Sequence, residues 1–249
     1  MVAADLWSTP PPGEITLGQT EVHVWRAVLD VEAAIVSRMC ELLSADERAR
    51  AERFHFQIDR RHFIVARAHL RMILSRYMNI APAEVRFEYS EHGKPMLANG
   101  NEPDGEIKFN LAHSAGIALF GFTRAGEIGV DLERIRPEIT GDDIARRFFS
   151  AAELACLERV PAPARQEAFF DCWTRKEAFV KAKGMGLSLA LDRFDVTLNP
   201  KEPAALLRTG WDADEAPRWS LKDVGVGPGY SGTVAVEAHH WNLNCYLAD

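Results

Sequence analysis

The chain of 249 residues has few cysteines and no long apolar run. Its cysteines, Cys40, Cys156, Cys172 and Cys245, are scattered without a C-x-x-C pair, so the sequence predicts neither a zinc site nor a disulfide framework. No apolar stretch is long enough to span a bilayer, and residues 1–5 lack the basic start and apolar core of a secretory signal. We therefore expect a cytoplasmic protein with no membrane partner.

Several catalytic motifs are also absent. The sequence contains no H-E-x-x-H, no G-x-S-x-G and no glycine-rich phosphate loop ahead of a helix. Zinc peptidase, serine hydrolase and nucleoside-triphosphatase functions therefore lose support. The length suffices for one large domain or two small ones with a buried core.

Positive charge is concentrated in one segment. The net charge of −7 argues against a general nucleic-acid binder, so no nucleic-acid partner is expected. Between Arg48 and Arg76, however, eight arginines face only two acids, Glu52 and Asp59, which leaves about +6 there and about −13 on the rest. This asymmetry indicates a local site for a small polyanion, and the alternative is a solvated helix surface. Apolar residues between the arginines allow only some of them to reach solvent together.

The two halves of the chain repeat one order of elements: a capped helix, a longer helix, then strands. Capping boxes begin at Ser44 and Ser150, longer helices are predicted over Phe63–Tyr77 and 168–183, and Gly184 suits the end of the second. The predicted strands are 21–29, 85–89, 107–111, 117–122, 128–133, 194–198, 219–224 and 229–238.

This repeat predicts an α+β fold of two similar lobes, each a small, mostly antiparallel sheet packed on helices. We place an N-terminal lobe at residues 1–123, with 1–20 as a loose lead-in, and a C-terminal lobe at 124–249. A ligand site between the lobes is the natural expectation.

Two carboxylates stand side by side on one predicted strand. Residues two apart on a strand point to the same face, so Asp131 and Glu133 lie together, opposite Ile128, Val130 and Leu132. Their repulsion needs an offset, and a hard cation that prefers oxygen ligands is one answer. The alternative is that both carboxylates lie on a solvent-exposed polar face of the strand, and the pair by itself favours this alternative.

The second long helix adds an acid and two lysines. On a helical wheel, Glu177 lies at the rim of the apolar face, and Lys181 lies one turn further on the same side. A surface ion pair between them is the simpler interpretation, worth about 0.3–0.5 kcal/mol. Lys176 lies near the centre of the apolar face, either snorkelling to the helix edge or held in a cleft. A lone histidine such as His113 is more often structural than functional.

The residues by themselves therefore indicate a two-lobed α+β protein with a basic helix, a carboxylate pair and a second helix bearing acid and lysine. That combination is compatible with Mg²⁺-assisted chemistry on a phosphate ester, and it names no substrate.

Motifs along most of the chain, from about Leu43 to Leu191, resemble the Sfp-type 4′-phosphopantetheinyl transferases of the holo-[acyl/peptidyl carrier protein] synthase superfamily. The two strongest are I-G-V-D-L-E at 128–133 and W-T-R-K-E-A-F-V-K-A-K-G at 173–184. Supporting matches are G-K-P at 93–95, F-N-L-A-H-S at 109–114, R-R-F-F-S at 146–150 and G-L-S at 186–188.

The resemblance implies a fold, an activity and partners. It implies two α+β lobes related by a pseudo-twofold, with coenzyme A bound between them as co-substrate. The implied enzyme uses Mg²⁺ to transfer 4′-phosphopantetheine to a serine of an apo acyl or peptidyl carrier protein and releases 3′,5′-ADP. We expect it to be a monomer, because the small trimeric synthase type has about half this length.

The resemblance also assigns residues. Asp131, Glu133 and Glu177 match the Mg²⁺ ligands that hold the pyrophosphate; Glu177 is the candidate base and Lys181 the candidate acid near the pyrophosphate. The positions that match contacts to the nucleotide end of coenzyme A are Arg50, Lys94, Ala112 and His113.

Two positions depart from the family pattern. Ala112 replaces a serine, so only its backbone N–H could contact the 3′-phosphate of coenzyme A, and Glu47 replaces a basic residue, so those contacts should rest more on Arg50. Two other functions remain open. One is a non-catalytic module that binds coenzyme A or a carrier protein, and the other is a Mg²⁺-dependent phosphodiesterase.

Overall fold

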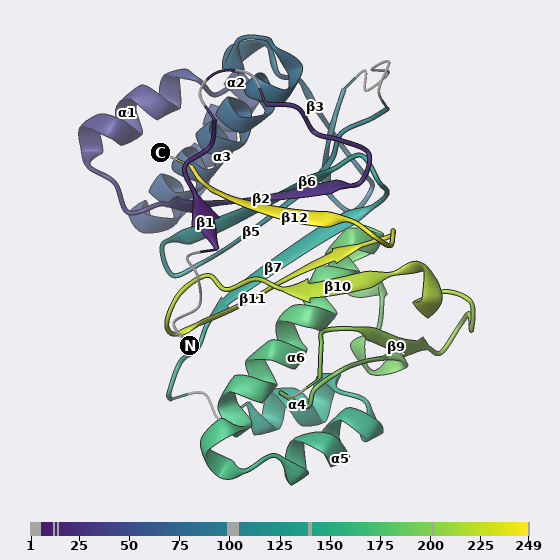
Figure 1. Ribbon diagram of the computed structural model, residues 1–249. Coiled ribbons are helices and arrows are strands. Elements are labelled where there is room, and N and C mark those ends of the chain that lie inside the picture. Colours follow the sequence, from purple (N-terminus) through teal and green to yellow (C-terminus); the bar gives the residue numbers. More distant parts are fainter. Residues whose placement is uncertain are drawn as a thin grey trace.

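Two β-sheets pack face to face, and helices cover the outer face of each, so the protein has four layers (Figure 1). The computed structural model describes residues 6–11, 13, 15–98, 105–138, 141–200 and 202–248. Within these residues, no helix is both long enough and apolar enough to cross a bilayer. The predicted α+β class is confirmed.

The upper half of Figure 1 contains a five-stranded sheet in the order β1-β12-β2-β6-β5. Its strands are β1 (Trp7–Ser8), β12 (Asn242–Leu247), β2 (Glu21–Val28), β6 (Ile117–Thr123) and β5 (Lys108–Ser114). β6 is antiparallel to β2 and β5, whereas β12 is parallel to β1 and β2. Three helices lie above this sheet: α1 (Ala33–Glu41), α2 (Ala45–Glu52) and α3 (Gln57–Met78).

The lower half contains an antiparallel sheet in the order β10-β11-β7. Its strands are β10 (Ser220–Asp223), β11 (Tyr230–Val236) and β7 (Ile128–Arg134). The helices below it are α4 (Asp142–Phe148), α5 (Ala151–Arg159) and α6 (Ala162–Lys183). Two small hairpins complete the described strands: β3 (Phe87–Tyr89) with β4 (Pro95–Leu97), and β8 (Phe194–Val196) with β9 (Leu206–Thr209).

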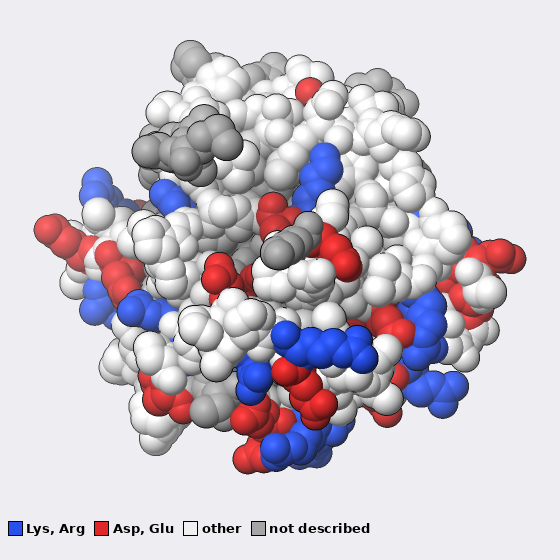
Figure 2. All heavy atoms as spheres, turned by 60° about the horizontal axis from the view of Figure 1, so that its bottom comes forward, with Lys and Arg blue, Asp and Glu red and all other residues white. Residues whose placement is uncertain are grey.

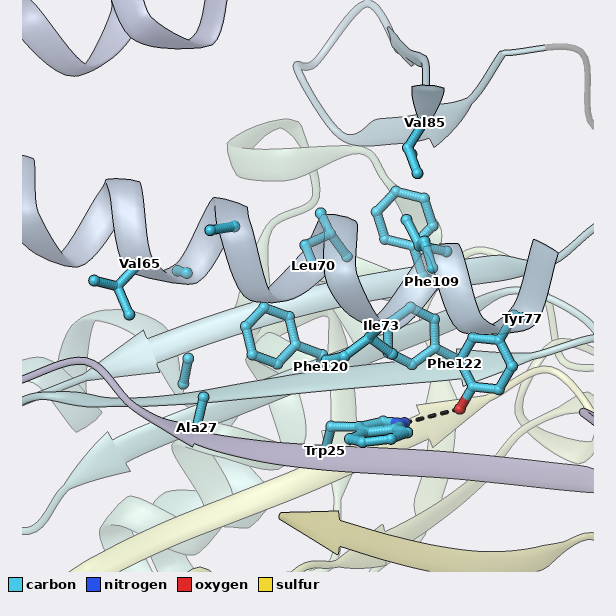
Figure 3. Close-up of a cluster of buried hydrophobic side chains, with 14 of the residues drawn as sticks. Trp25, Ala27, Val65, Leu70, Ile73, Tyr77, Val85, Phe109, Phe120 and Phe122 are labelled. Carbon is cyan, nitrogen blue, oxygen red and sulfur yellow. Dashed lines mark hydrogen bonds between the residues drawn. The ribbon is translucent and has the colours of Figure 1, made fainter. Parts of the chain in front are cut away.

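The upper core lies between α3 and the first sheet (Figure 3). Alternate residues of β2, including Trp25 and Ala27, point toward the helix because side chains alternate along a strand. Trp25 satisfies its buried indole N–H by donating to the hydroxyl of Tyr77 at 2.8 Å. Phe120 and Phe122 of β6 fill the space between helix and sheet.

The middle core lies between the two sheets. It contains Val22 and Val24 from β2 and Ile128, Val130 and Leu132 from β7. The predicted alternation of β7 is therefore confirmed, since its apolar residues face the first sheet. Its other residues face α6, which is where the predicted acidic pair belongs.

The edge strands β5 and β7 join the two halves through side chains. Asn110 of β5 accepts a hydrogen bond from the backbone N–H of Val130 at 2.9 Å. Further along, the backbone N–H of Arg134 donates to the hydroxyl of Ser114 at 3.1 Å. The two strands run in the same direction, and these side chains hold their ends together.

Strand β12 crosses between the halves. It lies outside the predicted strands and adds to the first sheet beside β2, with Cys245 opposite Val24. The division into residues 1–123 and 124–249 stays a prediction, and so does the pseudo-twofold; β12 crosses that division. Among the described residues, each half nevertheless contains one larger sheet, one two-stranded hairpin and three α-helices.

The predicted residues at the helix ends are found at those ends, but the two long helices begin earlier than predicted. At Ser150 both bonds of the capping box form, with the hydroxyl accepting from the backbone N–H of Glu153 at 3.2 Å, and at Ser44 the backbone N–H donates to Glu47 at 3.0 Å. α3 and α6 each begin six residues before the predicted start, because their first turns carry no apolar stripe. Gly184 ends α6 with a φ of 67°, a left-handed conformation that glycine adopts without steric cost.

Candidate active site

Close packing of α6 on β7 builds the site. A Cβ at Gly129 would lie 2.0 Å from the carbonyl oxygen of Ala178 and 2.3 Å from the backbone nitrogen of Ala182. Only glycine lets the helix approach the strand this closely. The approach sets Glu177 and Lys181 of the helix beside Asp131 and Glu133 of the strand, so the structure brings together four residues that the sequence singled out.

Asp131 is the most buried of the three carboxylates, with 4% of its surface exposed. Its Oδ1 accepts from Nζ of Lys181 at 2.5 Å, and its Oδ2 is buried without a hydrogen-bond partner among the described residues. The salt bridge of Lys181 therefore runs to the strand, and the simpler interpretation of a surface pair along the helix is wrong.

Glu133 and Glu177 carry raised pKa values. Burial raises the pKa of both carboxyls, and the negative charge of Asp131 raises them further. A hydrogen bond from Ser114, whose hydroxyl donates to Oε2 of Glu133 at 3.0 Å, and the charge of Lys181 oppose this rise. The site therefore concentrates negative charge that the surrounding residues only partly offset.

This donor set fits a hard divalent cation. Asp131 Oδ2 is an unsatisfied buried carboxylate oxygen, and Glu133 and Glu177 supply further oxygen ligands. The described residues contain no group of three acidic, histidine or cysteine side chains already placed to hold a metal. Mg²⁺ commonly binds through one or two carboxylates, with waters and substrate phosphates completing its shell. The residues that could hold it are Asp131, Glu133 and Glu177.

A cleft of about 530 Å³ opens beside these carboxylates. Both halves of the chain line it, as expected for a site between two lobes. Its walls are His92, Gly93, Lys94, Asn110, Leu111, Arg147, Phe148, Glu177, Val180, Lys181, Gly184, Gly186, Leu189, Ala190, Leu191 and Asp192.

Lys94 lines the cleft and also ties the two halves together. Its ammonium donates to Glu127 at 3.1 Å and to the backbone carbonyls of Ile128 and Ala182 at 3.2 and 2.9 Å. Burial lowers its pKa, and the charge of Glu127 opposes that effect. Lys94 thus fixes the β3–β4 hairpin against the base of β7 and the end of α6.

His113 and Ala112 point to opposite faces of β5. Ala112 is buried against the second sheet, so its methyl group is turned away from the outer face of the strand. His113 lies on that outer face, where desolvation by the surrounding protein, followed by the charges of His62 and Lys181, lowers its pKa. The histidine is therefore near Lys181.

Arg50 and Glu47 lie about one turn apart on α2 and differ in exposure. Arg50 is exposed, with its guanidinium over the ring of Phe63, and it lies outside the lining of the cleft. Glu47 is turned inward and accepts from Nε of Arg71 at 2.7 Å. This acidic replacement is therefore internal to the fold. Two arginines of the basic segment, Arg67 and Arg71, are buried, which confirms that only some reach solvent.

Lys176 is neither a snorkelling nor a cleft lysine, so both sequence interpretations are wrong. Its side chain is fully buried, and its ammonium lies 2.7 Å from both carboxylate oxygens of Glu153. It also donates to the backbone carbonyl of Phe194 at 2.7 Å. The wheel placed it correctly on the buried face but could not show an acidic partner on α5.

The sequence patterns did not indicate three side chains that lie near the site. Ser114 bonds Glu133, Asn110 bridges the edge strands, and Arg147 lines the cleft. Asn110 and Ser114 share a face of β5 with Ala112, and the predicted strand, which ends at residue 111, is too short to show that Ser114 lies on this face. Arg147 stands in the R-R-F-F-S motif, to which the resemblance assigned no residue role.

Comparison with known proteins gives a consistent result for both halves. Residues 127–235 match the model of the 4′-phosphopantetheinyl transferase superfamily, and residues 29–121 match the model of the N-terminal part of 4′-phosphopantetheinyl transferases.

Curated relatives that match over most of the chain are named as 4′-phosphopantetheinyl transferases. The 4′-phosphopantetheinyl transferase HetI of Nostoc sp. is 38% identical over 93% of this chain and 94% of its own length. The 4′-phosphopantetheinyl transferase ffp of Bacillus subtilis is 34% identical over 65% of this chain and 69% of its own. The 4′-phosphopantetheinyl transferase Sfp of Bacillus subtilis is 30% identical over 82% of this chain and 85% of its own. The chain therefore belongs to the 4′-phosphopantetheinyl transferase superfamily.

Proposed function

We propose that this chain transfers the 4′-phosphopantetheine arm of coenzyme A to a serine of an apo acyl or peptidyl carrier protein, with Mg²⁺, and releases 3′,5′-ADP. One observation carries the proposal. Asp131 keeps a buried carboxylate oxygen without a partner beside Glu133, Glu177 and Lys181, at the edge of a cleft lined by both halves. The activity in the names of the relatives agrees with it.

In the proposed reaction the serine oxygen attacks the phosphorus that bears the pantetheine arm. A new phosphate ester bond forms, the bond to the bridging oxygen of the pyrophosphate breaks, and 3′,5′-ADP leaves with the electron pair. Glu177 accepts the serine proton, which its raised pKa favours, and Lys181 offsets or protonates the departing phosphate. Mg²⁺ held by Asp131, Glu133 and Glu177 would stabilise negative charge on the phosphates.

We assign the nucleotide end of coenzyme A to Arg50, Lys94, His113 and the backbone of Ala112. Lys94 lines the cleft, and His113 lies near Lys181, which supports the assignment for both. The inward turn of Glu47 keeps its negative charge away from a ligand on the surface of α2, so this departure from the family pattern does not oppose binding. We further propose a cytoplasmic monomer that binds neither nucleic acid nor membranes.

The decisive experiment is intact-mass analysis of a panel of apo carrier proteins incubated with the protein, coenzyme A and Mg²⁺. The expected result is a carrier heavier by one phosphopantetheine and dependent on the divalent cation. No mass gain across the panel would refute the transferase.

The role of Glu177 is tested in the same assay, where unchanged transfer by Glu177→Gln would remove Glu177 from its proposed role.

Two further measurements separate the alternative functions. A non-catalytic module would bind coenzyme A and leave every carrier unmodified. A phosphodiesterase would release phosphopantetheine into water in the absence of any carrier.

A further inference from the structure

Three hydroxyl side chains meet in the interior of the lower half. On the outside of this half, acidic and basic side chains are interspersed (Figure 2). Inside it, between α6 and β11, lie Thr174, Ser231 and Thr233, which are 0%, 6% and 0% exposed. The Oγ1 of Thr174 lies 3.1 Å from the Oγ of Ser231 and 3.1 Å from the Oγ1 of Thr233. We call these three residues the hydroxyl cluster.

Two members of the hydroxyl cluster lie beside carboxylates of the site. In the pairing of β11 with β7, Ser231 is opposite Glu133. Thr233 is opposite Asp131 in the same register. Because directly opposite side chains of an antiparallel pair point to the same face, both hydroxyls face α6, as the two carboxylates do. A contact that fixes α6 to these hydroxyls therefore also fixes its distance from the carboxylates.

The protons of the hydroxyl cluster make Thr174 the donor between helix and strand. Ser231 donates its hydroxyl proton to Oδ1 of Asp171 at 2.6 Å. Thr233 donates its own to Oδ1 of Asp223 at 3.2 Å. A hydroxyl has one proton and two lone pairs, so both oxygens remain available to Thr174 as acceptors. The single proton of Thr174 can also reach the backbone carbonyl of Asp171, 3.2 Å away.

The acceptor of Thr233 is itself held in place. The carboxylate of Asp223 on β10 accepts from Nε and Nη2 of Arg175 at 3.0 and 2.5 Å, which is a bidentate pair. Arg175 directly follows Thr174 and also donates to the backbone carbonyl of Thr197 at 2.7 Å. This turn of α6 is therefore tied to β10, to β11 and to the residue that follows β8.

The helix α6 is attached to the sheet at two levels, and Glu177 lies between them. At one level, Ala178 and Ala182 pack on Gly129 so closely that no side chain fits there. At the other level, Thr174 reaches the hydroxyls of β11. A helix held at one level could tilt, and a tilt would move Glu177 relative to the strand carboxylates. Attachment at two levels fixes both the distance and the tilt.

We propose that Thr174, through the hydroxyl cluster, is a positioning residue that holds Glu177 at the distance from the two strand carboxylates at which all three can bind one divalent cation. This inference rests on the proposed function, in which that cation serves the transfer of phosphopantetheine. Metal ligands have to be held within about 0.5 Å of the productive geometry, so a small tilt of α6 is enough to weaken the site.

The test compares two replacements of Thr174. Thr174→Val puts a methyl group in place of the hydroxyl, and this group can neither donate a proton nor approach the oxygens of Ser231 and Thr233 to 3.1 Å without overlap. Thr174→Ser keeps the hydroxyl and loses only the methyl group. Calorimetry measures Mn²⁺ binding without coenzyme A, and the intact-mass assay measures kcat. We expect Thr174→Val to raise the Kd for Mn²⁺ and to lower kcat, each roughly tenfold, and Thr174→Ser to restore both.

Thr209→Val is the matched control. Thr209 of β9 is also buried, and its hydroxyl donates to the backbone carbonyl of Asp212 at 2.5 Å. It lies in the β8–β9 hairpin, which contains none of the candidate site residues. The change should lower the Tm, as Thr174→Val also should, and leave the Kd for Mn²⁺ and kcat unchanged. The comparison separates the loss of a buried hydrogen bond from a displacement of Glu177.

Thr233→Val is a milder second variant that keeps the proposal testable if Thr174→Val does not fold. Asp223 keeps its pair with Arg175, and Thr174 keeps Ser231 as an acceptor, so the fold should tolerate the change. We expect the Kd for Mn²⁺ and kcat to change in the same directions as in Thr174→Val, to a smaller extent.

Three outcomes overturn the proposal. The first is unchanged Mn²⁺ binding in Thr174→Val and Thr233→Val, and the second is an equal loss of Mn²⁺ binding in Thr209→Val, which would indicate a general effect of lower stability. The third is a Thr174→Ser variant as impaired as Thr174→Val. A wild-type protein that binds Mn²⁺ and never modifies a carrier refutes the proposed transfer, whereas the Mn²⁺ titrations of the variants still decide the role of Thr174.

Discussion

Asp131 and Lys181 form an ion pair in which only one carboxylate oxygen takes part. Oδ1 lies 2.5 Å from Nζ of Lys181, while Oδ2 is buried and has no hydrogen-bond partner among the described residues. The lysine is 31% exposed at the edge of the cleft, and the aspartate is almost completely covered. The ammonium thus offsets part of the negative charge that a divalent cation would neutralise.

Replacing Lys181 should therefore affect metal binding and transfer in opposite directions. In Lys181→Met, the site loses its neighbouring positive charge, so Mn²⁺ should bind the protein without coenzyme A on the order of tenfold more tightly. Transfer should fall by roughly 10²-fold or more, because the charge next to the departing phosphate is gone. Calorimetric Mn²⁺ titration and the intact-mass assay measure the two effects.

Lys183→Met is the matched control for this change. Lys183 lies two residues further along α6, and its ammonium donates to Glu215 at 3.0 Å, away from Asp131. Its removal should leave Mn²⁺ binding unchanged. Equal or weaker Mn²⁺ binding in Lys181→Met would show that the lysine does not compete with the metal.

Glu177→Gln should make the protein more stable and less active. Burial and the charge of Asp131 raise the pKa of Glu177 above its ordinary value of 4.5, so the folded state binds this proton more tightly than the unfolded state. Stability is therefore lost as the pH rises from about 4.5 through the raised pKa. The variant escapes that loss, and at neutral pH its Tm should exceed that of the wild type by about 2–4 °C.

Thermal unfolding of the wild type and of Glu177→Gln between pH 4 and pH 8 tests the sign of this pH dependence of stability. The difference in Tm should vanish at the acidic end and grow as the pH rises. Saturating Mg²⁺ should reduce the difference, since the cation stabilises the charged wild-type site. A variant that is less stable than the wild type at pH 7 would contradict the repulsion between Glu177 and Asp131.

The sequence could predict the site where local geometry decides it. Strand alternation placed Asp131 and Glu133 on one face, and the helical wheel placed Glu177 on the rim, because the period of each element fixes which residues share a side. The same alternation placed Ile128, Val130 and Leu132 together on the opposite face, which enters a core. These are properties of single elements.

The parts that could not be predicted depend on contacts between elements. Glu47 points inward because the rotation of α2 is set by its packing against α3, where Arg71 supplies the partner. Ser114 reaches Glu133 across the joint between two edge strands, a register that no single strand specifies. Strand β12 pairs with β2 from the far end of the sequence, and its ladder is formed by backbone groups that carry no residue signal.

The buried pair of Lys176 and Glu153 should be structural. Lys176→Met leaves the Glu153 carboxylate buried without its counter-ion, which should cost about 3–5 kcal/mol in the free energy of unfolding. Glu153 also accepts from the backbone N–H groups of Ser150 and Val196, so Glu153→Gln keeps part of this network.

A double-mutant cycle measures the interaction energy between Lys176 and Glu153 separately from their contacts with the rest of the protein. Lys176→Met combined with Glu153→Gln removes both charges, so it should be destabilised by clearly less than the sum of the two single changes. Urea unfolding measures all four corners of the cycle. Additive effects would show that the two side chains do not depend on each other, and loss of transfer without loss of stability would return Lys176 to the active site.

Gly129→Ala should dismantle the site without touching any of its polar side chains. The added methyl group would overlap the backbone of α6 at Ala178 and Ala182, so the helix must move away from β7 and carry Glu177 and Lys181 with it. We expect a loss of about 1–3 kcal/mol in stability, weaker Mn²⁺ binding and slower transfer. Gly225→Ala is the matched control, because a Cβ there meets no atom within 4 Å, and it should behave like the wild type. If Gly129→Ala bound Mn²⁺ and transferred phosphopantetheine normally, the close approach of α6 to β7 would not be what assembles the carboxylates and the lysine into one site.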